Sequence, residues 1–292
     1  MPPRVAVAGI VAFWLATTAY VGYRDVWPRV FASGPPPVTI ELADEAKQNV
    51  PARWALSRNG EKLGRLSTLM KYHDADDAFQ FTYRYSHLRL EQGGVTLEAP
   101  EAISDVRMTR AGDLKEQTMT AKVKVSFRGV PFAEGTIDVR GAVANGVLTG
   151  RAELKSSLRD LAADLDPVPV PRGQPLNPLQ PVNRISNVRG GQRWVVNEYN
   201  PLQDAVTDLV RKQLAKSGLP FGTAKPKDSL LAEVGGSPQT LTWQNQEVEC
   251  WVIEYRRNAD AIARTWVRTA DGKVLRQEAF EGGEALAFDR ED

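Results

Sequence analysis

Cysteine and histidine are nearly absent from this chain, which has one Cys and two His among 292 residues. One Cys excludes an intramolecular disulfide, and two His exclude a histidine-rich metal centre. A Ser-His-Asp or Cys-His site would have to use His73 or His87. Net charge is lacking as well, because 37 Lys and Arg stand against 36 Asp and Glu. Nucleic acid is therefore not an expected partner, since an electrostatic nucleic-acid binder carries a basic surface.

One long apolar run stands out near the start of the chain. Val5–Tyr23 has 19 residues without a charge, between Arg4 and Arg24. As a helix it would be about 28 Å long, close to the ~30 Å hydrocarbon core of a bilayer. Aromatic residues cluster at its C-terminal end, as in an interfacial belt: Tyr20, Tyr23 and Trp27. We predict an uncleaved transmembrane anchor. The alternatives are a buried core helix and a cleaved signal peptide, whose apolar region is normally only about 7–15 residues long.

The place of this run in the chain suggests where the protein resides. A very short N-terminus ahead of a large soluble domain is the usual plan of a signal anchor, although the flanking charges do not decide the orientation. We therefore expect a single-pass protein of the bacterial inner membrane, with its soluble part outside the cytoplasm. Residues 34–37, Gly followed by three Pro, would form a stiff spacer. Residues 1–37 are thus assigned to the anchor and its spacer.

The soluble part is dominated by alternating apolar and polar residues, the pattern of β-strands with one face in water. One stripe is aromatic and consists of Phe79, Phe81, Tyr83 and Tyr85. Asn59-Gly60, Asn145-Gly146 and Asp271-Gly272 separate strand-like runs, and such pairs favour tight hairpin turns with positive φ. Strands joined by tight turns must be neighbours. The expected fold class is therefore mainly β, with curved antiparallel meander sheets.

Prolines interrupt this β pattern. Six of them lie between residues 167 and 181, which excludes the interior of a regular strand or helix there. We expect a linker over residues 167–184, between an N-terminal β domain over 38–166 and a C-terminal domain over 185–292. A short helix is predicted just before the linker, over residues 157–165, because leucines at 158, 161 and 165 fall on one side of it.

A longer amphipathic helix is predicted over residues 201–216. Asn200 is a suitable N-cap, Pro201 fits the first helical position and Gly218 ends the helix. Its apolar stripe comprises Leu202, Val206, Leu209, Val210 and Leu214. This stripe needs an apolar surface to cover it, and we expect that surface to be the concave face of the C-terminal sheet.

The side chains that carry catalysis or bind metals do not converge. Residues 72–77, Tyr-His-Asp-Ala-Asp-Asp, have one His and lack the Gly and distal Glu of a calcium loop, so a polar turn is favoured over a metal site. His87 continues the aromatic stripe and is expected to be a partly buried sheet residue. Cys250 alternates with valines, as a small core residue would. We therefore predict no catalytic residue, no metal and no cofactor.

Aromatic residues concentrate in the C-terminal third of the chain. An ordinary core is one interpretation of them. The other is an apolar ligand cavity, because a curved sheet closed by one helix often leaves space beneath the helix. The candidate lining combines strand aromatics with the apolar side of the helix and consists of Leu202, Val206, Leu209, Val210, Trp251, Tyr255 and Trp266.

Two hairpins resemble those of a known group of proteins. Residues 54–65 read strand, Asn-Gly, basic residue, aliphatic residue, Gly, strand, and residues 263–276 place a Trp-containing strand before Asp-Gly. Both are similar to hairpins of bacterial envelope proteins of unknown function that are distantly similar to the lipoprotein carriers of the periplasm. The resemblance implies a strongly curved antiparallel sheet that holds acyl chains, with helices in its mouth. The proline stretch and the permanent anchor depart from soluble carriers, so the resemblance does not imply shuttling between membranes.

The leading functional hypothesis is a non-enzymatic module at the outer face of the inner membrane. It would bind an apolar ligand such as lipid acyl chains, or serve as a scaffold. The alternative is a protein–protein assembly component whose exposed strand edges pair with an envelope protein. An enzyme is the third hypothesis, and it is disfavoured because acid, base and nucleophile do not converge in the sequence.

Overall fold

The computed structural model describes the β-rich part of the chain and a few residues near its start. The described residues are 13, 14, 17, 18, 20, 50–92, 94–109, 112–157, 160–170, 181–197, 202, 229–281 and 284–292. The spacer 34–37 lies outside the described residues, and so does most of the predicted anchor Val5–Tyr23. Of the predicted helix over residues 201–216, only Leu202 is described.

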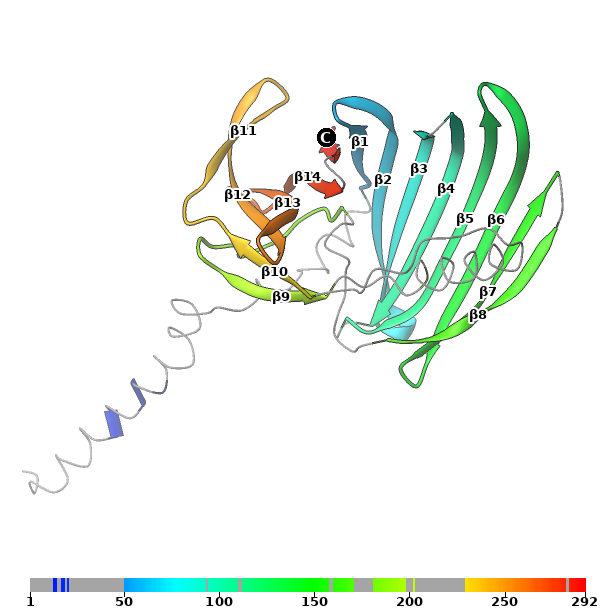
Figure 1. Ribbon diagram of the computed structural model, residues 1–292. Helices are drawn as coiled ribbons and strands as arrows, with labels where there is room; N and C mark the ends of the chain where they lie inside the picture. The colour runs from blue at the N-terminus through cyan, green and yellow to red at the C-terminus, as the bar shows by residue number, and fades with distance from the viewer. Residues whose placement is uncertain are drawn as a thin grey trace, which may run out of the picture.

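Fifteen β-strands form one antiparallel sheet (Figure 1). Their bounds are β1 Ala52–Arg58, β2 Glu61–His73, β3 Ala78–Gln92, β4 Val95–Thr109, β5 Leu114–Phe127, β6 Val130–Ala144, β7 Val147–Ser156, β8 Leu161–Pro169, β9 Arg193–Asn197, β10 Ser229–Val234, β11 Gln239–Trp243, β12 Gln246–Arg257, β13 Asp260–Arg268, β14 Val274–Glu281 and β15 Glu284–Arg290. Their order is β8-β7-β6-β5-β4-β3-β2-β1-β15-β14-β13-β12-β10-β9, with β11 paired to β12 beside this path. The prediction of a mainly β antiparallel meander is confirmed.

The first and last strands along the chain, β1 and β15, are neighbours in the sheet. Strand β1 pairs antiparallel with β15, so that Leu56 lies opposite Phe288. At the end of this pair, the Asn59 amide donates to the Ala285 carbonyl over 2.9 Å, and the Ala285 amide donates to the Asn59 side chain over 2.9 Å. The strands on both sides of the proline stretch therefore belong to one sheet. The division of the chain at residues 167–184 into two domains stays a prediction.

Two of the three tight turns that were predicted from the sequence are present in the structure. Asn59-Gly60 and Asn145-Gly146 both have positive φ at each residue and form two-residue turns, as predicted. At Asp271-Gly272 only the glycine has positive φ, and residues 269–273 form a longer connection between β13 and β14. Two further tight turns, Arg128-Gly129 and Gln244-Asn245, were not predicted. The second has no glycine, which explains why the usual signal is missing.

The short helix predicted over residues 157–165 is wrong, because this region enters strand β8. Leu165 is buried and lies opposite Gly150 of β7. Strand β8 continues through Pro167 to Pro169, residues that were expected to belong to the linker. Proline is tolerated there because β8 is the last strand on its side of the sheet order, where a missing backbone N–H need not break a ladder.

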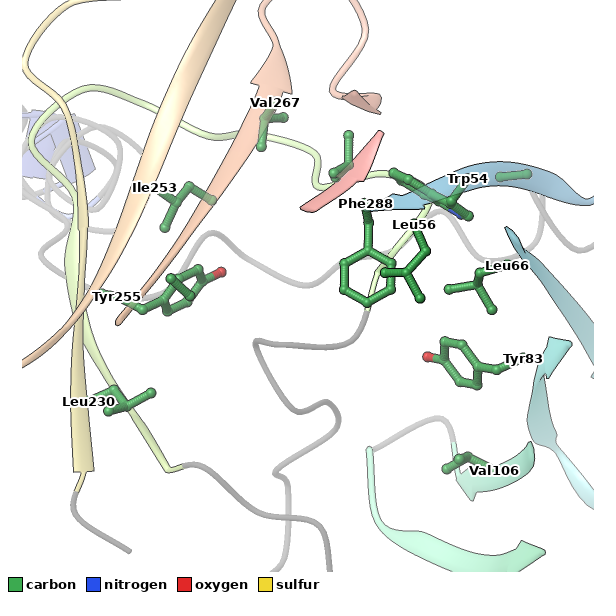
Figure 2. Packing of buried hydrophobic residues seen from close by; sticks show 14 of the residues in the cluster. Trp54, Leu56, Leu66, Tyr83, Val106, Leu230, Ile253, Tyr255, Val267 and Phe288 are labelled. Carbon is green, nitrogen blue, oxygen red and sulfur yellow. The ribbon is translucent and has the colours of Figure 1, made fainter. Parts of the chain in front are cut away.

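Three clusters of buried apolar side chains stabilise the sheet. The largest joins strands β1–β4 with β10 and β12–β15 and includes Trp54, Leu56, Leu66, Tyr83, Val106, Leu230, Ile253, Tyr255, Val267 and Phe288 (Figure 2). The second lies on β6–β8 and comprises Val139, Leu148, Leu165 and Leu202. The third comprises Leu241, Cys250 and Leu275, with Trp243, Val248 and Trp266 packed against it. Both ends of the described β region therefore contribute to the main core.

Candidate functional site

The face of the sheet that carries the largest apolar cluster is the candidate binding surface, and is called the interior surface below. Strand alternation places its side chains. In β3, Tyr83 and Tyr85 belong to this cluster, whereas the intervening Arg84 is exposed. Figure 2 shows Tyr83 and Tyr255 approaching the middle of the cluster from two different parts of the sheet. The interior surface is therefore built jointly by the two halves of the chain.

Three tyrosines of the interior surface, Tyr83, Tyr85 and Tyr255, have their hydroxyl groups in apolar surroundings. Tyr83 is 2% exposed and Tyr255 is 6% exposed. Burial raises the pKa of Tyr85 and that of Tyr255 to about 12, and it also raises the pKa of Tyr83. All three phenols thus stay neutral at physiological pH and keep a proton to donate.

The tyrosine hydroxyls differ in their partners. Tyr255 has a hydrogen bond with the side chain of Thr265, which lies in β13 and is 1% exposed. The Tyr83 hydroxyl has no hydrogen bond to another residue in the described part of the chain. In Figure 2 the hydroxyls of Tyr83 and Tyr255 both point toward the middle of the cluster. The hydroxyl oxygen is not one of the fully buried side-chain atoms that lack a partner, so it keeps some accessible surface, which marks Tyr83 as a candidate ligand contact.

Asn183 links the strands that meet at the β1–β15 junction. Its side-chain oxygen accepts from the Thr68 hydroxyl over 2.6 Å, and Thr68 in turn accepts from the Trp54 indole over 3.1 Å. Its carbonyl accepts from the Arg290 guanidinium over 2.8 Å and from the Val274 amide over 3.1 Å. Residues 181–184 therefore belong to the packed structure, although the sequence assigned them to the linker. Their proline-rich surroundings contain no signal for this role.

The candidate lining predicted from the sequence is only partly brought together. Trp251 and Tyr255 both pack in the interior cluster. Trp266 lies on the opposite face of the sheet, because it pairs with Val252 and packs with the third cluster instead. Trp266 therefore does not share a face of the sheet with Trp251 and Tyr255. Its indole donates to Glu278 over 3.2 Å on that other face.

Leu202 packs on a different part of the sheet from the one that we expected. It is 2% exposed and contacts the cluster on β6–β8, rather than the C-terminal strands. The remaining members of the predicted helical stripe, Val206, Leu209 and Val210, lie outside the described residues. A cavity beneath that helix stays a prediction.

The Asp-rich segment before β3 forms a turn held by ion pairs. Asp76 ends a turn of 3-10 helix, Asp74–Asp76, and lies 2.8 Å from the Arg107 guanidinium and 3.0 Å from Lys115 Nζ. Hydrogen bonds from Lys115 and then Arg107 lower the pKa of Asp76. His73 contacts Gln80 at 3.0 Å. Within the described residues, no group of three or more His, Cys, Asp or Glu side chains is arranged to hold a metal ion.

The two remaining candidates are unsuited to catalysis in this arrangement. His87 was expected to be partly buried, but it is exposed and interrupts the β3–β4 ladder with a positive φ of 55°. The register of β3 with β4 is the same on both sides of His87, which stands opposite Pro100, a residue without a backbone N–H to donate. Cys250 is fully buried, and burial raises the pKa of its thiol to about 11. A thiol of this kind is a poor nucleophile at neutral pH.

In the described part of the chain, no helix combines the length and the apolar character that crossing a bilayer requires. Only five residues of Val5–Tyr23 belong to that part, so the anchor and the localisation at the inner membrane stay predictions.

Comparisons with known proteins identify no family. No family model matches the sequence, and no curated protein matches it. Among solved structures, the chain is similar to a β-barrel-like protein of a domain of unknown function, DUF1849, from Brucella abortus. The alignment has 13% sequence identity and a TM-score of 0.34, and covers 82% of this chain and 95% of the other.

Proposed function

We propose that the protein is a non-enzymatic, membrane-anchored module of the cell envelope that binds an apolar ligand, such as a lipid acyl chain, on its interior surface. The observation that carries this proposal is Tyr83, a residue buried among apolar side chains, whose hydroxyl oxygen keeps some accessible surface and has no hydrogen-bond partner among the described residues. A ligand with an apolar chain and one polar acceptor would match both the apolar surroundings of Tyr83 and its hydroxyl donor. A fatty acid or an acyl ester has this chemistry.

The energetics favour such a ligand over a small polar one. Each methylene removed from water contributes about 0.8 kcal/mol, so a chain of several methylenes gains a substantial binding free energy on an apolar surface. The oxygen of a carboxylate or ester accepts a hydrogen bond from a phenol, so a bound acyl chain would give the Tyr83 hydroxyl a partner. Aromatic residues supply much of the contact area, with Phe81, Tyr85 and Trp251 only partly buried in the cluster.

The proposal is tested by titrating the full-length protein in detergent with a fluorescent fatty acid, dansyl-undecanoic acid. We expect saturable binding to the wild type. Tyr85→Ser, which truncates an interior aromatic, should weaken binding about tenfold or more because it removes most of an apolar contact. Arg84→Ser is the matched control, since Arg84 is the exposed neighbour on the same strand.

Native mass spectrometry of the detergent-extracted protein provides an independent measurement. A bound species with the mass of a lipid or fatty acid would support the proposal, and would report the stoichiometry as well. Absence of both a bound species and saturable probe binding would overturn it. Equal loss of probe binding in Tyr85→Ser and Arg84→Ser would show that the probe binds elsewhere.

The second candidate function is assembly with an envelope protein through a strand edge. Strand β9 supports it, because it ends the sheet order of the described strands and its Val195 is 68% exposed. An exposed edge of this kind can accept a strand from a partner. A photo-cross-linking residue at Val195 should then capture a partner in cells, whereas one at Ala144, an exposed position on β6, should not. Equal labelling at both positions would argue against pairing at this edge.

A further inference from the structure

The tip of the β5–β6 hairpin exposes three large apolar side chains. Phe127 ends β5 and is 49% exposed, while Val130 and Phe132 at the start of β6 are 66% and 65% exposed. Phe127 and Val130 lie opposite one another across the Arg128-Gly129 turn. Because paired residues point to the same face, these two side chains form one continuous apolar patch.

This apolar tip is held in place by the neighbouring turn. The Arg128 amide donates to the Gly94 carbonyl over 2.7 Å, and the Arg128 guanidinium lies 5.3 Å from the centre of the Phe127 ring. A Cβ on Gly94 would be 3.6 Å from Arg128 Cγ. The tip therefore rests against the β3–β4 turn, yet within the described residues it leaves the three apolar side chains uncovered.

The size of the patch argues against a stable protein partner. A phenylalanine side chain buries about 150–250 Å² when fully covered, so two half-exposed rings and one valine offer on the order of 300 Å². A specific protein interface needs about 800 Å² on each partner. A narrow, convex tip of this size can instead enter a soft medium, in which the surroundings rearrange around each side chain.

The charge at the tip fits a membrane surface. Arg128 lies in the turn itself, whereas the two lysines farther along β5 face acidic residues of β4: Lys124 lies opposite Glu98, and Lys122 Nζ is 4.0 Å from Glu101 Oε2. Basic side chains with long apolar stems extend their charge toward phosphate groups while aromatic rings occupy the interfacial region. We propose that the β5–β6 tip inserts into the surface of a lipid bilayer, with Phe127, Val130 and Phe132 among the acyl chains and Arg128 at the headgroups.

A polarity-sensitive fluorophore on Val130→Cys tests this insertion in the full-length protein, reconstituted into vesicles of phosphatidylcholine and phosphatidylglycerol. Unmodified protein provides the labelling background, because Cys250 is buried. The control label is on Ala144→Cys, at the other end of the same strand and also exposed. We expect a nitroxide on the lipid chains to quench the label at 130 and not the label at 144, and aqueous iodide to do the reverse.

Substitution of the flanking rings shows whether they drive the insertion. Phe127→Ser with Phe132→Ser should reduce quenching of the 130 label by the lipid nitroxide about tenfold or more, because each ring loses its gain from burial. Far-ultraviolet circular dichroism checks that this variant still folds.

Equal quenching of the labels at 130 and 144 would overturn the proposal. A concentration-dependent shielding of the 130 label without vesicles would also overturn it, in favour of a second copy of the chain. Neither result depends on binding of the fatty-acid probe, so the two proposals fail separately.

Discussion

Leu202 fills the space that Gly141 leaves open on strand β6. A Cβ at position 141 would lie 3.3 Å from Leu202 Cδ1 and 3.0 Å from Leu148 Cδ1. Strand β9 ends at Asn197, only five residues before Leu202, and five residues span at most about 18 Å. Strand β9 is at one end of the sheet order, whereas β6–β8 are at the other end. Leu202 therefore packs on β6–β8, although the strand that precedes it in the chain, β9, is at the other end of the sheet order.

The first prediction concerns this contact. Leu202→Ala should lower the free energy of unfolding by about 2–5 kcal/mol, because it removes buried methyl groups and leaves a cavity against Leu148. Leu231→Ala is the control, since Leu231 is 41% exposed and should cost much less. Urea denaturation followed by tryptophan fluorescence measures both. A cost for Leu202→Ala as small as the control would mean that the contact does not stabilise the fold.

The second prediction uses the turn between β6 and β7. Asn145 and Gly146 have φ values of 53° and 73°, a region that β-branched residues resist. Gly146→Val should therefore destabilise the fold by about 1–2 kcal/mol. A Cβ on Gly146 meets nothing closer than 3.8 Å, so this cost would come from the backbone and not from a steric clash. Gly146→Asn separates the two causes, because Asn tolerates positive φ and should cost less. Similar denaturation midpoints for wild type and Gly146→Val would contradict the assignment.

Local features of this fold were predictable from the sequence, whereas long-range pairing was not. The two residues Asn59-Gly60 are enough to predict a turn. The alternation of apolar and polar residues over Phe79–Tyr85 is enough to predict a strand. Pairing of β1 with β15 joins residues such as Leu56 and Phe288, which share no local signal. A candidate lining drawn from one third of the chain therefore missed the contribution of Trp54 and Tyr83 to the interior surface.

Two differences between the expectations and the structure came from patterns that fit more than one structure. Leucines at 161 and 165 are four residues apart, a spacing that puts them on one face in a helix and in a strand alike. Helix and strand were therefore not distinguishable at β8 from these residues. The position of Trp266 depends on its register with β12, where it lies opposite Val252 rather than Trp251. A shift of one residue reverses the face, and the sequence pattern of one strand does not fix the register of two.

The third prediction is a pH dependence at the β13–β14 connection. Asp271 accepts from Arg268 Nε over 2.8 Å and from Nη2 over 2.5 Å, and these hydrogen bonds lower the pKa of Asp271 to about 2. An unfolded Asp has a pKa of about 3.9, so the ionised form contributes stability above about pH 4, and the contribution is lost as the pH falls toward 2. Asp271→Asn should therefore cost about 1–2 kcal/mol at pH 7. The difference from wild type should shrink as the pH falls from 4 toward 2.

Thermal unfolding from pH 7 to pH 2.5 measures this dependence. Asp74→Asn is the control, because Asp74 is exposed in the Asp74–Asp76 turn. A stability difference for Asp271→Asn that stays constant over this pH range would show that the ionised carboxylate is not what stabilises the connection.

The last prediction separates a ligand contact from a structural role at Tyr83. Because the Tyr83 hydroxyl has no partner among the described residues, Tyr83→Phe should leave the stability of the ligand-free protein unchanged within about 0.5 kcal/mol. The same change should weaken binding of dansyl-undecanoic acid about tenfold, since a hydrogen bond to a carboxylate is worth about 1.5–3 kcal/mol. Tyr255→Phe gives the contrasting control, because its hydroxyl is bonded to Thr265 and its loss should lower stability by about 1 kcal/mol. If Tyr83→Phe instead lowers stability and leaves probe affinity unchanged, Tyr83 is an ordinary core residue and the polar end of the ligand does not bind there.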